Sequence, residues 1–378
     1  MFVFELITFP RLRLTTRTIL TIALAFCVCL CCYQNGQFAR SLAPESISKD
    51  PGTGMTRSKV HTCHIGGGLE TKVHVPTQPH FIIIGAQKCG TTSLFRYLIQ
   101  HPNVHPPRNW IEEGSAEVHF FDFRIPTDRQ HQFDTTDEFF CYVRKTYIQQ
   151  YFYADVLLDA ASNGTNLVSF EKTPRYLQEF SLVPGYITKT CPWLRKLIAV
   201  IRDPVDRSYS HYNMDRNIKG DPHGFERSIL VELENMTTAG LIEWNYESMS
   251  FVPTVLPPEE EVEAFLGLPQ KPQYVRRGLY EIQLREWSKM FSIPNELLVI
   301  NYDDLRGNGA GTVFQRILDH ISLPRYNISS GYDIHNSRPY TTPMLNRTRR
   351  LLQHFYEPYN TKLSLLLGEK WRDAWKYS

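Results

Sequence analysis

The chain has 378 residues, of which 42% are hydrophobic, enough to bury one sizeable core. The 41 Lys and Arg nearly balance the 39 Asp and Glu, which leaves a net charge of +2 at pH 7. This balance excludes a strong whole-molecule field. A polyanionic partner would therefore need a local basic patch, and no nucleic-acid partner is expected.

The N-terminal part of the chain divides into three segments. A tail over 1–17 contains arginines and is followed by an uncharged apolar run over 18–33. Positive charge before such a run predicts a single-pass, type II signal-anchor helix, with the tail in the cytosol and the remainder in the lumen. A cleaved signal peptide is the alternative. Residues 34–75 are rich in Gly, Ser, Pro and charge, which predicts a flexible luminal stem.

N-glycosylation sequons also favour luminal exposure of the remaining chain. Their acceptor residues are Asn163, Asn235, Asn327 and Asn346. Half of the eight cysteines lie in or at the apolar run. Of the others, Cys141 and Cys191 are the expected disulfide, and Cys89 is expected to be a free thiol. No spacing of cysteines resembles a zinc site, so no metal is expected.

From residue 76 onward, apolar strand patterns alternate with helical patterns. The expected strands cover 80–84, 167–171, 196–201 and 296–301. The expected helices cover 91–101, 204–217, 278–291, 311–321, 345–356 and 360–367. This alternation predicts an α/β domain over 76–378, with a central parallel sheet covered by helices on both faces. Residues 221–272 are Pro-rich and are expected to form an irregular insertion, a candidate lining of a substrate cleft.

The first expected strand runs into the segment 85–93, GAQKCGTTS. Gly85 and Gly90 allow close backbone approach. Backbone N–H groups at the start of the following helix, together with the helix dipole, make such a turn an anion site. A Walker A loop has Lys after its second Gly, whereas this chain has Thr91 there and carries Lys88 inside the loop. A plain strand–turn–helix connection with an incidental lysine is the alternative.

A second strand–turn–helix pattern covers 197–210, LIAVIRDPVDRSYS. Asp203 is suited to cap the helix and Pro204 to occupy its first turn. Arg202 at the strand end and Ser210 two helical turns later can converge on one anion. The alternative is a capped helix with a surface arginine.

These two segments resemble the G-x-x-K-x-G-T-T and R-D-P-x-x-R-x-x-S elements of sulfotransferases. Residues 117–122, EVHFFD, and 170–176, FEKTPRY, resemble elements of the heparan sulfate sulfotransferases. The glucosaminyl 3-O-sulfotransferase branch is the most similar, and N-sulfotransferase-type domains are also similar. The resemblance extends over roughly 80–375, with the motifs in the family's order.

The resemblance implies a P-loop-like sulfotransferase fold and 3′-phosphoadenosine 5′-phosphosulfate (PAPS) as the sulfuryl donor. The residues implied to hold the 5′-phosphosulfate are Lys88, Cys89, Gly90, Thr91, Thr92 and Ser93. Arg202 and Ser210 would hold the 3′-phosphate. Tyr280 would border the adenine, and Arg338 occupies the place of a basic loop that closes over PAPS.

The implied reaction is in-line transfer of a sulfuryl group to a hydroxyl or amine of a glycosaminoglycan-like polysaccharide, with heparan sulfate favoured. Glu117 is the expected base, with a pKa raised by shielding from Phe120 and Phe121. Lys88 and Lys172 would stabilise the charge that develops at the sulfuryl group, so the reaction would require no metal ion. His119 would orient Glu117 or the sugar. The implied substrate-binding residues are His119, Asp122, Lys172 and Arg175. The implied location is the Golgi membrane, with the catalytic domain luminal.

Other functions remain open at this point. A P-loop kinase would require Mg²⁺ and a lysine after the second glycine of the loop. A non-catalytic glycan-binding protein would keep the fold without the chemistry. Within the enzyme class, the acceptor is alternatively a chondroitin-like chain, another polysaccharide or, ranked last, tyrosine.

Overall fold

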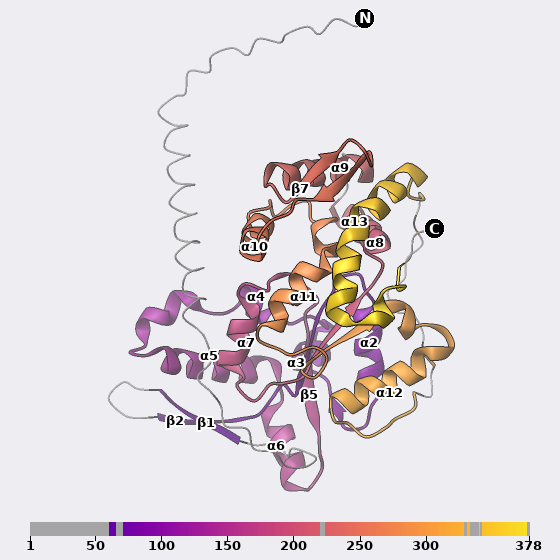
Figure 1. Ribbon diagram of the computed structural model, residues 1–378. Helices are drawn as coiled ribbons and strands as arrows, with labels where there is room; N and C mark the ends of the chain where they lie inside the picture. The colour runs from indigo at the N-terminus through magenta and orange to yellow at the C-terminus, as the bar shows by residue number, and fades with distance from the viewer. Residues whose placement is uncertain are drawn as a thin grey trace, which may run out of the picture. The chain divides into compact units, whose positions relative to one another are not determined.

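The computed structural model describes residues 60–65, 71–219, 224–328, 331–332, 340 and 342–375, all within the unit Gly52–Ser378 (Figure 1). The strands are β1 (Val60–Ile65), β2 (Thr71–Pro76), β3 (Phe81–Gly85), β4 (Val104–His105), β5 (Val168–Lys172), β6 (Leu197–Ile201), β7 (Ile242–Asn245), β8 (Ser250–Pro253) and β9 (Leu297–Asn301). The α-helices are α2 (Thr91–Leu98), α3 (Arg108–Glu113), α4 (Phe120–Phe123), α5 (Thr136–Tyr151), α6 (Ala154–Ser162), α7 (Val183–Thr190), α8 (Pro204–Lys219), α9 (Phe225–Thr238), α10 (Pro258–Leu266), α11 (Tyr280–Ser288), α12 (Ala310–His320) and α13 (Asn346–Leu367). Short 3₁₀ helices are η1 (Thr127–Gln132), η2 (Tyr176–Gln178), η3 (Arg276–Gly278), η4 (Tyr302–Leu305), η5 (Gly307–Gly309) and η6 (Glu369–Trp371).

The central sheet has five strands in the order β4-β5-β3-β6-β9, and each neighbouring pair is parallel. Every residue of β3, β5 and β6 is buried, which is typical of parallel strands covered on both faces. The predicted α/β class with a central parallel sheet is therefore confirmed. The four strands predicted from the sequence are also confirmed, because β3, β5, β6 and β9 each begin one residue after the predicted start.

The order of the strands fixes where a ligand site can form. After β3 the chain adds β4 and β5 on one side, and it then crosses to add β6 and β9 on the other side. This reversal is a topological switch point, and ligands of open α/β sheets bind beyond the carboxyl ends of the strands at such a point. The segments that leave β3, β5 and β6 therefore meet at one edge of the sheet.

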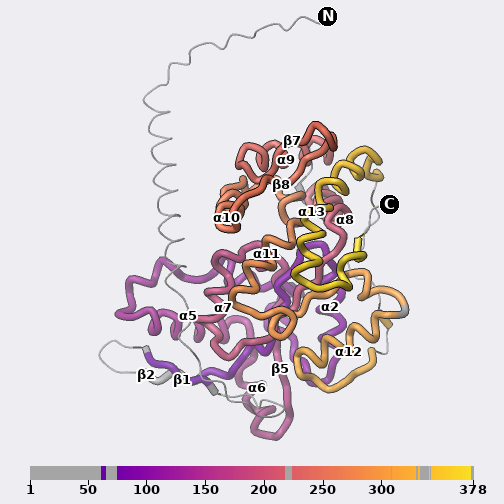
Figure 2. The backbone as a smooth tube through the Cα atoms, in the orientation of Figure 1, coloured from indigo at the N-terminus to yellow at the C-terminus, as the bar shows by residue number. Residues whose placement is uncertain are grey.

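Aromatic packing fixes α2 against the sheet. Phe95 of α2 lies 5.1 Å from Phe170 of β5, and Phe170 stacks on Phe81 of β3 with 4.7 Å between ring centroids. Further along α2, Tyr97 contacts Phe314 of α12 edge-to-face at 6.4 Å, so α2 and α12 lie side by side (Figure 2). Because these contacts bury one face of α2, its first turn is held rigidly at the switch point.

An antiparallel hairpin of β1 and β2 precedes the sheet. A disulfide joins Cys63 of β1 to Cys141 of α5. The predicted Cys141–Cys191 disulfide is therefore wrong, and Cys191 is a buried free thiol at the end of α7. The hairpin also shows that folded structure begins within the segment 34–75, whose composition predicted a flexible stem. That composition did not reveal the hairpin, because the pairing depends on a partner strand and on a cysteine of a distant helix.

Two helical regions differ from the sequence-based expectation. The segment 221–272, predicted to be irregular, contains α9, the β7–β8 hairpin and α10. Its apolar residues Phe225, Ile229, Leu233 and Met236 recur at helical spacing and are buried. The two C-terminal helices predicted over 345–356 and 360–367 form one helix, α13, with Pro358 inside it. Burial of the same face before and after Pro358 keeps this helix continuous despite the missing N–H.

Several expectations concern residues outside the described part of the chain. These are the cytosolic tail over 1–17, the signal-anchor helix over 18–33, the stem before Val60, and Arg338. Within the ranges that the structure describes, no helix has the length and apolar character needed to cross a membrane.

Candidate functional site

The loop between β3 and α2 has the geometry of an anion-binding turn. Lys88 and Gly90 both adopt positive φ, at 72° and 81°. A Cβ on Gly90 would lie 2.6 Å from the ring of Tyr302, so only glycine fits there. Gly90 is the N-cap of α2, no side chain caps the helix, and its first turn holds no acidic residue. The N–H groups of this turn are therefore not competed for by a local carboxylate.

The remaining loop residues differ in exposure. Thr91 and Ser93 are buried, as is Cys89, whose Sγ lies 3.5 Å from the hydroxyl of Tyr280. Burial raises the pKa of the Cys89 thiol, so the thiol stays neutral. Tyr280 is itself buried, so the structure places it against the loop as a support.

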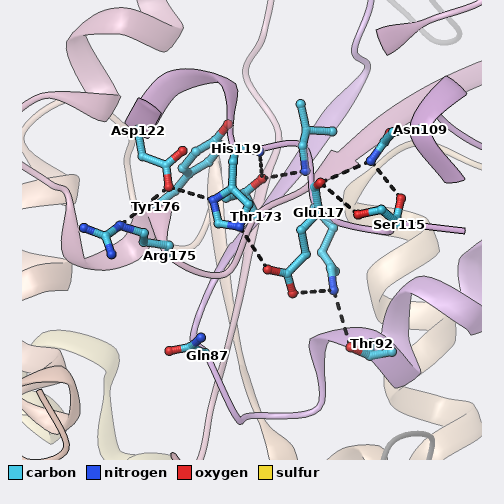
Figure 3. Close-up of polar contacts among 12 residues, drawn as sticks. Gln87, Thr92, Asn109, Ser115, Glu117, His119, Asp122, Thr173, Arg175 and Tyr176 are labelled. Atoms are coloured by element: carbon cyan, nitrogen blue, oxygen red, sulfur yellow. Dashed lines mark hydrogen bonds and ion pairs between the residues drawn. The ribbon is translucent and has the colours of Figure 1, made fainter. Parts of the chain in front are cut away.

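Lys172, the last residue of β5, links this loop to the predicted base. Its Nζ donates to Glu117 Oε1 at 3.0 Å and to Thr92 Oγ1 at 3.4 Å (Figure 3). The Lys172 side chain is only 2% exposed, whereas the Glu117 side chain is 37% exposed. The ammonium is thus enclosed between the two partners, and the carboxylate opens into a cleft with a volume of about 350 Å³.

A chain of polar contacts extends from Glu117 on its other side. His119 Nε2 lies 3.2 Å from Glu117 Oε2, and His119 Nδ1 lies 2.8 Å from Asp122 Oδ2. Arg175 Nε approaches the same Asp122 oxygen at 3.6 Å. The structure therefore brings together Glu117, His119, Asp122 and Arg175 (Figure 3), and Lys172 bonds to Glu117. The sequence marked all five residues as candidates.

The pKa values of this cluster follow from its alternating charges. Burial raises the pKa of Glu117, but the hydrogen bond from His119 and the charge of Lys172 outweigh it and lower the pKa to about 2. Burial lowers the pKa of His119, but its bonds to Asp122 and Glu117 raise it to about 9. Burial also lowers the pKa of Lys172, and Glu117 opposes this shift. At neutral pH the cluster thus holds an imidazolium and a carboxylate.

The expectation that shielding by Phe120 and Phe121 raises the pKa of Glu117 is wrong. Both rings are buried in the core and pack on Tyr147, with centroid distances of 4.6 Å and 4.9 Å. The environment of Glu117 is consequently set by two cations rather than by aromatic rings.

The sequence analysis did not single out the residues that orient the cluster around Glu117, which are Thr173 and Tyr176. Thr173 Oγ1 accepts hydrogen bonds from the backbone N–H groups of Val118 (3.3 Å) and His119 (3.0 Å). Tyr176 Oη accepts from the N–H groups of Phe120 and Phe121 at 2.9 and 3.0 Å and donates to Glu171. The signal was present in the segment FEKTPRY, whose Thr and Tyr are the orienting residues.

Glu171 contacts both of these orienting residues and is fully buried. It accepts hydrogen bonds from Tyr147, Tyr176 and Thr173. Burial raises the pKa of Glu171 to about 7, although these hydrogen bonds oppose the shift. Three donors on one carboxylate fix the turn after β5, which positions Lys172 and Thr173.

Arg202 lies where β6 ends, as the sequence predicted. Its guanidinium is 5.0 Å from the ring of Tyr302 and pairs with Asp206 at 3.5 Å. Ser210 is four residues beyond Asp206 on α8, so both lie on one helix face. Arg349 of α13 also pairs with Asp206, at 2.9 Å, and was not singled out from the sequence. The structure thus supplies a second arginine beside the predicted 3′-phosphate element.

The glycosylation candidates lie on described residues. Asn163, Asn327 and Asn346 are exposed, whereas Asn235 is half-buried within α9. In the described ranges, no group of three or more His, Cys, Asp or Glu side chains is arranged to hold a metal ion.

Comparison with known proteins identifies related chains. The family model described as "Sulfotransferase domain" matches residues 78–326. The chain is 25% identical over 319 residues to human heparan sulfate glucosamine 3-O-sulfotransferase 3B1, covering 77% of this chain and 63% of that protein. It is 25% identical over 325 residues to mouse carbohydrate sulfotransferase 15, covering 79% of this chain and 54% of that protein.

A further relative is the human bifunctional heparan sulfate N-deacetylase/N-sulfotransferase 3, at 27% identity over 315 residues, covering 76% of this chain and 30% of that protein. The chain thus spans less than two thirds of the length of these curated relatives. Among solved structures, a sulfotransferase from Alicyclobacillus acidocaldarius matches with a TM-score of 0.47 at 21% identity, covering 78% of this chain and 99% of that one.

The family match extends over more than half of the chain. It includes the loop after β3, the Glu117–Lys172 cluster and the Arg202 segment, which the fold brings to one edge of the sheet. The chain therefore belongs to the sulfotransferase domain family.

Proposed function

We propose that this protein is a PAPS-dependent sulfotransferase whose acceptor is a glycosaminoglycan-like polysaccharide, with heparan sulfate favoured. Family membership supports the reaction class. The observation that carries the proposal is the position of Lys172, whose ammonium touches both Glu117 and Thr92 of the phosphate-type loop. An acceptor held at Glu117 would therefore lie beside the donor's reacting end.

The loop fits an anionic donor. The uncapped N-terminus of α2, the glycine at position 90 and the absence of acid from the first turn together favour a phosphate group. Under the proposal, residues 88–93 hold the 5′-phosphosulfate, and Arg202 with Ser210 holds the 3′-phosphate. PAPS supplies an activated sulfuryl group whose S–O bond to phosphate breaks as the acceptor oxygen or nitrogen forms a new bond to sulfur. Lys88 and Lys172 stabilise the charge that develops there.

Glu117 is the proposed base. Its carboxylate is ionised at neutral pH and is open to the cleft, so it can accept the acceptor's proton. With two cationic partners it is a weak base. When Lys172 turns toward the sulfuryl group, Glu117 loses one cation and its proton affinity rises. His119 keeps the second contact, and Asp122 fixes the His119 ring.

The acceptor class rests on the relatives, two of which carry heparan sulfate in their names. Arg175, close to His119, is proposed to contact the sugar together with Lys172. Asp122, which the sequence marked as substrate-binding, has a fully buried side chain and is proposed to act only by holding His119 and Arg175. A chondroitin-like or other polysaccharide is the alternative acceptor. A non-catalytic glycan-binding protein or a kinase would replace the proposal if sulfate transfer failed.

We also propose a type II Golgi membrane location with the catalytic domain in the lumen. The N-terminal apolar run after arginines supports the anchor. The Cys63–Cys141 disulfide supports an oxidising compartment, where such bonds persist. N-glycosylation at Asn163, Asn235, Asn327 and Asn346 would follow from that location.

The proposal is tested by incubating the full chain with labelled PAPS and desulfated heparin, heparan sulfate, chondroitin or dermatan in the presence of EDTA. Transfer to one polymer supports the class and names the acceptor. If no polymer is labelled, failure to bind adenosine 3′,5′-bisphosphate favours the non-catalytic alternative, whereas binding of it indicates an acceptor outside the panel. Strict dependence on Mg²⁺ favours the kinase.

A further inference from the structure

The cleft at Glu117 continues beyond the residues assigned to chemistry. Its lining residues are Thr92, Arg96, Trp110, Gly114, Ala116, Glu117 and Lys172. Thr92, Glu117 and Lys172 form one end through their mutual hydrogen bonds. Arg96 and Trp110 have no role in the chemistry proposed above, yet they line the same cleft.

Arg96 lies one helical turn from the reacting end. Thr92 and Arg96 are four residues apart on α2, so they share a face of the helix and are separated by about 6 Å along its axis. Within the described residues, no carboxylate lies within ion-pair distance of the exposed Arg96 guanidinium. A guanidinium in a cleft that has no acidic partner can form an ion pair with an anionic group of the ligand.

Trp110 of α3 holds this guanidinium in place. The Arg96 guanidinium carbon lies 5.4 Å from the centroid of the Trp110 ring, which is the geometry of a cation–π contact. The indole is fixed in turn by an edge-to-face contact with Phe95 at 5.1 Å. Arg96 is therefore pre-organised, which reduces the side-chain entropy lost when it binds a ligand.

The acidic residue Glu112 of α3 is engaged elsewhere. Glu112 accepts from Arg108 at 3.1 Å and from the hydroxyl of Tyr153 at 2.9 Å. Glu113 is exposed at the C-terminal end of α3 and does not line the cleft. The positive charge at this end of the cleft is thus not cancelled by Glu112.

We propose that Arg96 binds a carboxylate or sulfate on the sugar next to the one that is modified, with Trp110 as its positioning residue. The inference rests on the proposed function, because it places the modified sugar at Glu117. A guanidinium presents paired N–H donors that match either anion. The acceptor would then need a negative charge on the sugar beside the modified one, and Arg96 would bind this charge.

Direct binding tests this inference separately from catalysis. The full chain, saturated with adenosine 3′,5′-bisphosphate, is titrated with octasaccharides of heparan sulfate and of chondroitin sulfate. The same octasaccharides are used after carboxyl reduction and after desulfation, which distinguishes the two anions. The variants are Arg96→Met, Arg96→Lys and Trp110→Leu. Arg108→Met is the matched control, because Arg108 also lies over an aromatic ring, that of Tyr153 at 4.2 Å, but does not line the cleft.

Arg96→Met is expected to weaken binding of the charged octasaccharide by roughly 10-fold or more, the scale of one hydrogen bond between charged groups. Arg96→Lys should recover part of this loss, and Trp110→Leu should lose less than Arg96→Met. Arg96→Met and the wild type should bind equally well to the octasaccharide that lacks the anion bound by Arg96. Nucleotide affinity and melting temperature should stay at wild-type values in Arg96→Met.

Equal affinity of Arg96→Met and the wild type for every charged octasaccharide would overturn the inference. So would an equal loss in Arg108→Met, or no binding of any octasaccharide by the wild type. If the wild type transfers no sulfate but its octasaccharide binding still depends on Arg96, the proposed reaction fails while the anion subsite stands.

Discussion

Lys172 Nζ lies 3.0 Å from Glu117 Oε1, which joins the end of β5 to the segment between α3 and α4. The same ammonium reaches Thr92, so one buried cation contacts both the proposed base and the proposed donor site. Under the proposed function, this single side chain would couple loss of the acceptor's proton to neutralisation of the leaving phosphate.

Replacing Lys172 with Met should lower kcat by ~10²–10³-fold, the usual loss when one group that stabilises developing charge is removed. Loss of the cation should also raise the pKa of Glu117, since Lys172 is one of the two groups that lower it. Steady-state kinetics with saturating PAPS measure the first effect. Lys289→Met is the control, because Lys289 is 60% exposed and pairs only with Glu286 in the described residues. A kcat within twofold of wild type would remove Lys172 from the chemistry.

The pH dependence of kcat/KM should show a fall as pH rises through about 9, because a neutral His119 that keeps its proton on Nδ1 for Asp122 no longer donates to Glu117 and no longer orients it. Glu117 stays ionised down to about pH 2, so it should produce no acid limb between pH 5 and 8. In His119→Gln the fall in kcat/KM near pH 9 should disappear, because glutamine does not titrate in this range. A limb centred near 6.5, the ordinary His value, would contradict the ion-paired His119.

The same pKa shifts predict how folding stability depends on pH. The folded pKa of His119 is raised from 6.5 to about 9, so its contribution is fully present below 6.5 and is lost as pH rises through 9. The folded pKa of Glu117 is lowered from 4.5 to about 2, so its contribution is present above 4.5 and is lost as pH falls through 2. Urea unfolding of wild type and His119→Gln at pH 6 and pH 9.5 measures the first effect. Parallel changes in both proteins would exclude it.

Replacing Cys63 with Ser should lower the free energy of unfolding by about 2–4 kcal/mol, because the disulfide closes a loop with a sequence separation of 78. Chemical denaturation without reductant measures the loss. Wild type with reductant is the control and should match the variant. The same reasoning predicts that a chain beginning at residue 75 is destabilised, since it lacks β1 and Cys63. Equal stability of wild type and Cys63→Ser would mean that the disulfide contributes nothing to the stability of the domain.

Gly90→Ala should be markedly more destabilising than Gly240→Ala. Both glycines have positive φ, which costs an Ala about 1–2 kcal/mol. At Gly240 a Cβ meets nothing within 4 Å, but at Gly90 it meets the Tyr302 ring at 2.6 Å, adding about 1–3 kcal/mol of overpacking. Equilibrium unfolding compares the variants, and calorimetry with adenosine 3′,5′-bisphosphate should find weaker binding only in Gly90→Ala. Equal losses would show that Tyr302 moves aside freely.

The parts of the fold that sequence reasoning predicted are those with local causes. Runs such as 81–85 and 197–201 are apolar and uninterrupted, and a glycine or a proline marks the turn after each, so the strands and their loops are readable from neighbours in the chain. The members of the Glu117 cluster were also readable, because each lies at the end of a predicted strand or in a distinctive motif, whereas Arg349 beside Asp206 was not.

The parts that were missed depend on distant partners. The disulfide joins Cys63, in a segment of stem-like composition, to a cysteine of α5. The low pKa of Glu117 comes from the hydrogen bond of its chain neighbour His119 and from the charge of Lys172, which is remote in the chain and meets Glu117 only in the folded protein. The role of Thr173 depends on N–H groups of Val118 and His119 that turn toward it. The disulfide, the Lys172 contact and the Thr173 contacts each join segments that only the fold brings together.

The central claim is that Glu117 acts as a base in sulfate transfer from PAPS. The most direct measurement compares the wild-type chain with Glu117→Gln for labelled sulfate transfer to the glycan panel with EDTA present, alongside nucleotide affinity. The account predicts transfer to one polymer by the wild type, a loss of ~10²–10⁴-fold in the variant, and unchanged binding of adenosine 3′,5′-bisphosphate. Transfer by Glu117→Gln at the wild-type rate would contradict it.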